Sequence, residues 1–115
     1  MINQNVLNEL IINLKLKHSK IQELLLEHCT DINLEYIQLV LIKIKTSQRN
    51  KGYGSAVMSD LIKFADTQNV QIRLYMKDVS ELKRLQGFYI KQGFVLIKNS
   101  VNKEMVYNPK KINKK

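Results

Sequence analysis

The sequence predicts a single α/β domain, on three observations. The chain has 115 residues, of which 44% are hydrophobic. Segments with strand periodicity and helix periodicity alternate along it, and no internal repeat divides it. A chain of this length can bury roughly two thirds of its unfolded surface, which is enough for one core. We therefore expect one domain over residues 1–109 and a basic, disordered tail over residues 110–115.

The middle and the end of the chain give the clearest patterns. Residues 36–45 are apolar on both faces as far as Ile42, which predicts a central strand. Residues 53–68 have apolar side chains at helical spacing, and residues 70–76 alternate apolar with polar, which predicts a helix and then a strand. Ser80 suits the N-cap of a helix over 81–92, and Gly93 suits the left-handed position that ends it. Short strands over 94–97 and 105–107 follow, with a turn at 99–102.

Residues 1–33 are the least certain part of the domain and fit more than one pattern. Ile12, Leu14 and Leu16 alternate as in a strand. The stretch ELLLEHC, residues 23–29, fits either a helix or a strand of a meander, and residues 31–33 predict a turn. The expected order is an unassigned segment followed by strand, loop, helix, strand, helix, strand and strand.

The composition limits the classes of function. Nineteen Lys and Arg against ten Asp and Glu give a net charge of +9, and four of the lysines lie in the last six residues. This charge suits an anionic cofactor, a nucleic-acid-associated partner, an acidic protein surface or solubility alone, and it does not choose among them. No apolar run approaches the ~20 residues of a membrane span, and no signal-peptide pattern opens the chain. Because Cys29 also has no cysteine partner, we expect a cytoplasmic protein.

The stretch QRNKGYGSA, residues 48–56, joins the central strand to the first clear helix. The first amides of a helix lack internal partners, glycine lets the backbone approach a ligand, and Arg49 and Lys51 add positive charge. The stretch therefore suits a phosphate group. Its spacing excludes a Walker loop, which needs GxxxxGK, and a dinucleotide fingerprint, because Val57 occupies the third glycine position. Taken alone, the two glycines are also compatible with a simple tight turn.

Two motifs together resemble the GNAT family of N-acetyltransferases. RNKGYG matches that family's [RQ]-x-x-G-x-[GA] loop at Arg49, Gly52 and Gly54. Downstream, GFYIKQGF resembles the family's Y-x-K-x-G-F motif, matched at Tyr89, Lys91, Gly93 and Phe94. The resemblance covers residues 34–107. It implies the GNAT fold, in which a mixed, mostly antiparallel sheet has splayed central strands and flanking helices.

This resemblance implies acetyl-CoA as the cofactor and direct transfer of its acetyl group to an amine. The loop amides would hold the CoA pyrophosphate, and the pantetheine arm would lie along the exposed edge of the central strand, much as an added strand does. The implied cofactor-binding residues are Ile42, Lys43, Ile44, Arg49, Asn50, Lys51, Gly52, Tyr53, Gly54 and Ser55. No metal site is expected, because the two histidines lack metal-ligand spacing.

The resemblance also implies catalytic positions. Tyr89 matches the tyrosine that protonates the leaving thiolate in many members, while its place in an apolar stripe also suits a core aromatic. Gln38 stands where some members carry a glutamate base; it cannot accept a proton at neutral pH but could hold a water or the amine. Glu35, three residues away, should point to the opposite face of a regular strand. Asp78 and Glu81 are further candidates for the base.

The acceptor is left open. Little chain is available to wall off the acceptor site, which favours a macromolecular amine, such as a protein lysine or N-terminus, or a site completed by a second copy of the chain. Two alternatives remain. One is a CoA-binding module without turnover, because Gln38 replaces the glutamate. The other is a basic nucleic-acid-associated protein on a GNAT scaffold, which the lysine-rich tail favours.

Overall fold

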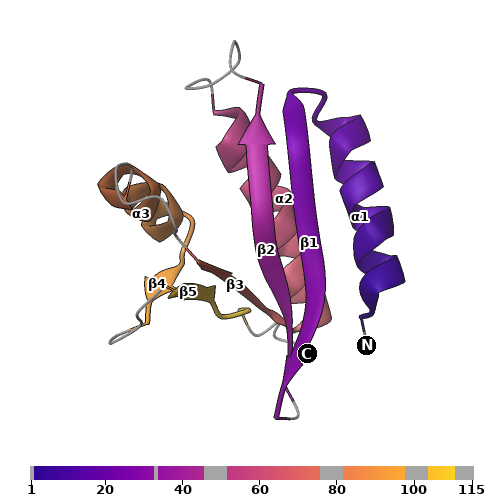
Figure 1. Cartoon of the computed structure of the whole chain (residues 1–115), viewed down its shortest axis with the longest axis vertical. Helices are drawn as coiled ribbons and strands as arrows, with labels where there is room; N and C mark the ends of the chain where they lie inside the picture. Colours follow the sequence, from indigo (N-terminus) through magenta and orange to yellow (C-terminus); the bar gives the residue numbers. More distant parts are fainter. Residues whose placement is uncertain (1, 33, 46–51, 76–81, 98–103, 111–115) are drawn as a thin grey trace, which may run out of the picture.

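The computed structural model describes residues 2–32, 34–45, 52–75, 82–97 and 104–110, which form three helices and five strands (Figure 1). In chain order they are α1 (Gln4–Lys17), β1 (Ile21–Asp31), β2 (Leu34–Ile44), α2 (Tyr53–Gln68), β3 (Gln71–Tyr75), α3 (Leu82–Lys91), β4 (Val95–Leu96) and β5 (Glu104–Tyr107). The described strands form one sheet in the order β1-β2-β3-β5-β4. Strands β2 and β3 are parallel, and the other neighbouring pairs are antiparallel. The predicted α/β class with a mixed, mostly antiparallel sheet is confirmed.

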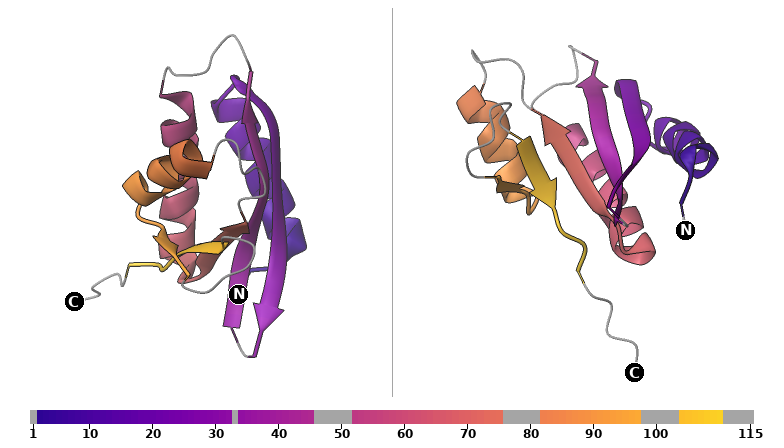
Figure 2. Two further views of the ribbon diagram at one scale, coloured as in Figure 1. Left: turned by 60° about the vertical axis from the view of Figure 1, so that its left-hand side comes forward. Right: turned by 60° about the horizontal axis from the view of Figure 1, so that its bottom comes forward.

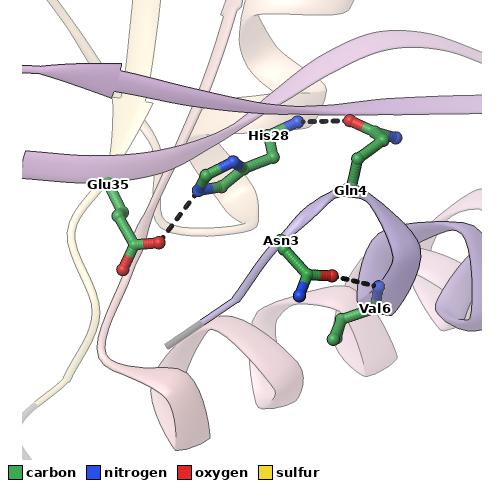
Figure 3. A network of polar contacts seen from close by, with 5 residues as sticks. All are labelled: Asn3, Gln4, Val6, His28 and Glu35. Atoms are coloured by element: carbon green, nitrogen blue, oxygen red, sulfur yellow. Dashed lines mark hydrogen bonds and ion pairs between the residues drawn. The ribbon is translucent and has the colours of Figure 1, made fainter.

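The N-terminal segment begins with a helix, so the strand suggested by the alternation there is wrong. Ile12, Leu14 and Leu16 all lie in α1. Leu14 is buried in the core, whereas Ile12 and Leu16 are exposed on the outer surface of the helix, and these outer apolar side chains produced the alternation. Asn3 caps the helix, since its side-chain oxygen accepts a hydrogen bond from the backbone N–H of Val6 at 2.9 Å (Figure 3).

The outer edge of β1 is bound by a side chain of α1. Gln4 Nε2 donates to the Leu26 carbonyl at 3.1 Å, and the backbone N–H of His28 donates to Gln4 Oε1 at 2.8 Å (Figure 3). The amide group thus satisfies backbone groups that a further strand would otherwise pair with. The stretch ELLLEHC, which fitted either a helix or a strand, belongs to this edge strand.

The core lies between one face of the sheet and the three helices, and Figure 2 (right) shows α2 behind the strands β1, β2 and β3. Its buried side chains include Leu7, Leu14, Ile37, Leu39, Val57, Met58, Leu61, Ala65, Ile72, Leu74, Tyr89, Met105 and Tyr107. Polar contacts tie the helices to this arrangement. His18, which follows α1, lies 2.6 Å from Asp60 of α2 (Nε2 to Oδ2), and the Tyr107 hydroxyl donates to Asp66 at 2.8 Å.

Left-handed residues end two of the helices. Asn69 has φ 58° after α2, and Gly93 has φ 103° after α3, which confirms the role predicted for Gly93. A Cβ atom at Gly93 would lie 3.3 Å from Tyr107 Cε1, so the close approach of β5 also favours glycine there. The predicted helices and strands from residue 36 onward are present. The predicted N-cap Ser80 and the predicted turn at 99–102 lie outside the described residues.

Candidate active site

Strands β2 and β3 are paired over a short stretch and then separate. The parallel register runs from Tyr36 opposite Gln71 to Gln38 opposite Arg73. Beyond Gln38, β2 continues to Ile44 without further pairing to the described part of β3. Figure 1 shows the two strands diverging toward the end of β2 that leads to α2. The splayed central strands expected of the fold are therefore present, and the separation begins at Gln38.

A β-bulge lies just inside the separation. Leu26 of β1 lies opposite Leu39 of β2, but Leu25 lies opposite Leu41, so Val40 is an extra residue on β2. A bulge disrupts the ladder locally and leaves its extra residue unpaired. Periodicity did not reveal this bulge, because the run around it is apolar on both faces. Ile37 and Leu39 are buried, whereas beyond Val40 the even-numbered Ile42 and Ile44 pack against the core, which fits one extra residue in the strand.

The segment that was expected to lie along the cofactor follows the bulge. Ile42 and Ile44 pack against the core, and Lys43 lies opposite Glu23 of β1. All three belong to the part of β2 that has left β3, so they are next to the separation as the resemblance implied.

The first turn of α2 lies at the open end of the separated strands (Figure 1). Gly52 is its N-cap with φ 82°, a conformation that favours glycine, and a glycine has no side chain with which to cap the first amides. The first turn, with Tyr53, Gly54 and Ser55, contains no acidic residue. Uncapped amides at the positive end of a helix dipole suit an anion. The other residues of the predicted loop, Arg49, Asn50 and Lys51, lie outside the described residues.

Helix α3 packs closely against this first turn. Gln92 Nε2 donates to Ser55 Oγ at 3.1 Å, and a Cβ atom at Gly54 would lie 3.5 Å from Phe88 Cζ. Gly54 therefore leaves room between the two helices. At Gly87 an added Cβ would meet no atom within 4 Å, so no described neighbour explains the glycine in the middle of α3.

Tyr89 of α3 is part of the hydrophobic core. Its ring is packed edge-on against Phe88 and Phe94, with centroid distances of 5.1 and 5.5 Å, and the residue is 8% exposed. Burial raises the pKa of the Tyr89 phenol. The phenol is therefore protonated at neutral pH.

Gln38 lies on the face of the sheet opposite the helices. Its neighbours on that face are Glu27 of β1, directly across the ladder, and Arg73 of β3. The guanidinium of Arg73 lies 4.1 Å above the ring of Tyr36. Burial and the neighbouring Cys29 thiol raise the pKa of the Tyr36 phenol. The sequence drew no attention to Glu27, because its segment could not be assigned to a strand and its partner was therefore unknown.

Glu35 points away from Gln38. It lies on the face that the helices cover, where its Oε1 atom is 2.9 Å from Nε2 of His28 (Figure 3). The expectation that Glu35 and Gln38 face opposite sides is confirmed, because the bulge begins only after Gln38. The other candidates for the base, Asp78 and Glu81, lie outside the described residues.

Neither a metal centre nor a membrane-spanning helix is present in the described ranges. Among those residues no group of three or more His, Cys, Asp or Glu side chains is placed to hold a metal ion. No helix in the described part of the chain has the length and apolar character needed to cross a bilayer.

No protein-family model and no curated protein sequence matches this chain. Solved structures do match it by fold. The NatC complex bound to Gag peptide and CoA superimposes with a TM-score of 0.61 at 11% identity, over 76% of this chain and 60% of that chain. The N-acetyltransferase YlbP of Bacillus subtilis, in complex with coenzyme A, gives 0.54 at 19% identity, over 75% and 59%. A GNAT-family acetyltransferase of Staphylococcus aureus gives 0.56 at 23% identity, over 74% and 57%.

These likenesses identify the fold as that of the GNAT N-acetyltransferases. The chain spans about 57 to 60% of the length of these three structures.

Proposed function

We propose that this chain is an N-acetyltransferase that binds acetyl-CoA and transfers the acetyl group directly to an amine, such as a protein lysine or N-terminus. The observation that carries the proposal is the separation of β2 from β3 at Gln38, with the uncapped first turn of α2 at its open end. An elongated ligand with an anionic end fits such a gap. Two of the structures with the same fold are complexes with CoA, which supports this ligand.

This geometry supports a set of cofactor-binding residues. The pyrophosphate is held by the amides of Tyr53, Gly54 and Ser55 after the left-handed Gly52, and the side chains of Arg49 and Lys51 contribute positive charge from the preceding segment of the chain. The pantetheine arm runs alongside Ile42, Lys43 and Ile44, in the direction of the bulge. In this arrangement the pantetheine arm lies beside β2 as an added strand would.

Bound acetyl-CoA supplies a thioester whose carbonyl carbon the amine nitrogen attacks. Oxygen charge that develops in this attack needs fixed donors, and backbone N–H groups beside the Val40 bulge are available because a bulge leaves the ladder unpaired. When the carbon–sulfur bond breaks, Tyr89 donates its phenolic proton to the departing sulfur. Gln38 orients the amine or a water by hydrogen bonding, since an amide cannot accept the proton. The protons that the amine loses pass to bulk water, and water returns one proton to the Tyr89 phenolate.

Binding and turnover are tested separately. Thermal unfolding with excess acetyl-CoA should show a rise in melting temperature, because a ligand that binds only the folded state stabilises it. Calorimetric titration with CoA should then give a stoichiometry of one per chain. A Gly54→Val variant, whose side chain intrudes between α2 and α3, should lose the rise. No stabilisation by acetyl-CoA or CoA would contradict the cofactor assignment.

Turnover is measured by thiol release and by mass spectrometry on a panel of peptides with free N-termini or lysines. Acetylation of a panel member establishes the transferase. A chain that binds acetyl-CoA but transfers to no amine supports the alternative of a CoA-binding module, which the replacement of a carboxylate by Gln38 favours.

A further inference from the structure

Three side chains from three strands form a row on the open face of the sheet where β2 and β3 separate. Glu27 of β1 lies directly opposite Gln38 of β2, and Gln38 lies opposite Arg73 of β3. Side chains of directly opposed residues in an antiparallel pair lie on one face, with Cβ atoms ~4.5–5.5 Å apart. Glu27 and Gln38 are therefore direct cross-strand neighbours on the open face.

Glu27 differs from the carboxylates on the helix-covered side in having no partner. Glu35 is paired with a histidine at 2.9 Å, and Asp60 with another at 2.6 Å. Asp66 accepts hydrogen bonds from the Tyr107 hydroxyl and from the backbone N–H of residue 110, each at 2.8 Å. Within the described residues no hydrogen bond or ion pair involves the side chain of Glu27, and the residue is exposed. Its negative charge is available to a ligand.

The neighbouring cation does not neutralise this charge. Arg73 donates from Nε and Nη2 to Gln71 Oε1 at 3.1 and 3.0 Å, and its Nη1 lies 3.6 Å from Asp31 Oδ2. The guanidinium is also stacked on Tyr36. These contacts hold the Arg73 guanidinium near the start of β2. The side chains of the row that lie toward the bulge are therefore the Glu27 carboxylate and the Gln38 amide.

We propose that Glu27 binds the ammonium group of the acceptor beside the thioester, and thereby selects a cationic amine over a neutral hydroxyl acceptor. This inference rests on the proposed function. At Gln38 the strand beside the cofactor offers only an amide, which carries no charge. The charge that a cationic acceptor needs is supplied from one strand further out, on the same face. Glu27 is in this sense an acceptor-binding residue.

Two coenzyme A conjugates of equal length test the assignment whatever the acceptor is. S-(3-aminopropyl)-CoA carries an ammonium group where an attacking amine would lie, and S-butyl-CoA has a methyl group in its place. Calorimetric Kd values at pH 7 and low salt are compared for the wild type, Glu27→Gln and Glu23→Gln. Glu23 is a matched control, because it is also exposed on β1 but lies opposite Lys43, toward the far end of β2.

The wild type should bind the aminopropyl conjugate roughly two- to fivefold more tightly than the butyl conjugate, the range expected of an exposed ion pair. Glu27→Gln should abolish this preference, Glu23→Gln should retain it, and added salt should reduce it. Unchanged binding of S-butyl-CoA by Glu27→Gln shows that the variant is folded, so that loss of the preference is specific to the charge.

Equal affinity of the wild type for the two conjugates would overturn the role of Glu27 and leave cofactor binding intact. A Glu27→Gln variant that keeps the preference would do the same. If neither conjugate nor acetyl-CoA binds the wild type, the proposed function fails, and the role of Glu27 fails with it. Binding of acetyl-CoA separates these two kinds of failure.

Discussion

Tyr89 is the residue whose surroundings bear most directly on the chemistry. Its buried ring fixes the direction of the hydroxyl, and burial raises the pKa of that hydroxyl. The phenol is therefore protonated at neutral pH and has a proton to give to the thiolate as the thiolate forms. The same packing that made Tyr89 resemble a core aromatic in the sequence thus serves the proposed proton transfer.

Replacement of Tyr89 by Phe should lower kcat by about 10²-fold, the lower end of what general acid catalysis contributes, while the Kd for acetyl-CoA stays unchanged. The measurement is thiol release with a panel amine that the wild type acetylates. Tyr107→Phe is the control, because it also removes a phenol from the core, and it should lose stability without a comparable loss of kcat. An unchanged kcat in Tyr89→Phe would exclude the proton-donor role.

Gly93 and Gly87 make a matched pair for stability. Gly93→Ala should destabilise the protein by ~1–3 kcal/mol, since alanine is strained at φ 103° and its Cβ would lie 3.3 Å from Tyr107. Gly87→Ala should instead stabilise it by ~0.5–1 kcal/mol, because this helical position has free space. Urea unfolding followed by circular dichroism measures both. Equal effects of the two substitutions would contradict the geometry at the end of α3.

At the scale of elements, the junction of α1 with α2 depends on a short polar contact. Asp60 faces both His18 at 2.6 Å and Lys17 Nζ at 3.0 Å. The hydrogen bond with His18 is the largest influence on the Asp60 carboxyl, and with Lys17 it lowers the pKa of that carboxyl. The side chains of His18 and Asp60 are only 14% and 18% exposed, so solvent screens the contact weakly.

A double-mutant cycle with His18→Ala and Asp60→Asn should give a coupling free energy on the order of 1 kcal/mol near neutral pH. Because the folded-state pKa of Asp60 is depressed, its contribution is present above the unfolded pKa of about 4 and is lost as the pH falls through the folded value. The coupling should therefore decline in acid. Unfolding free energies at pH 7 and pH 3 measure it, and an equal coupling at both would contradict this account.

The elements also show which features of the fold could be predicted from the sequence and which could not. The helix at residues 53–68 was found in full because its apolar spacing is regular and its flanks are polar. The N-terminal helix was missed because Ile12 and Leu16 expose apolar side chains on its outer surface, which imitates alternation. The bulge at Val40 is set by the cross-strand partners on β1, and a single sequence contains no register.

The candidate site likewise has one part that could be predicted from the sequence and another part that could not. The backbone features of the proposed cofactor site were predicted from local motifs around Gly52 and Tyr89, which short stretches of sequence specify. Glu27 became visible only when the ladder placed it beside Gln38, eleven positions later in the chain. Contacts between strands depend on register, so this part of the site could be read only from the fold.

At the scale of the whole molecule, the tyrosines determine how the free energy of unfolding depends on pH in alkaline solution. Burial is the first cause of a raised pKa in Tyr36, Tyr75, Tyr89 and Tyr107. Burial and the bond to Asp66 raise the pKa of Tyr107 to about 12. Phenols of the unfolded chain ionise near pH 10. The stability that these residues contribute is therefore complete below pH 10 and is lost as the pH rises through their folded values.

The free energy of unfolding should fall steeply between pH 10 and pH 12, as measured by urea unfolding at fixed ionic strength. Tyr107→Phe should make the fall shallower, because phenylalanine has no proton to lose. A slope that is the same in wild type and Tyr107→Phe would contradict the assignment.

The contact of Gln4 with the backbone of β1 has a consequence for solubility. An uncovered strand edge invites pairing between molecules, and here one amide side chain at the start of a helix protects it. This protection is lost when the first turn of α1 unfolds, and Asn3 caps that turn. Asn3→Ala should therefore promote intermolecular association measured by light scattering, and Gln4→Ala should do so more strongly, whereas Asn5→Ala should not. Resistance to aggregation would then be decided by the fraying of a helix end rather than by the sheet itself.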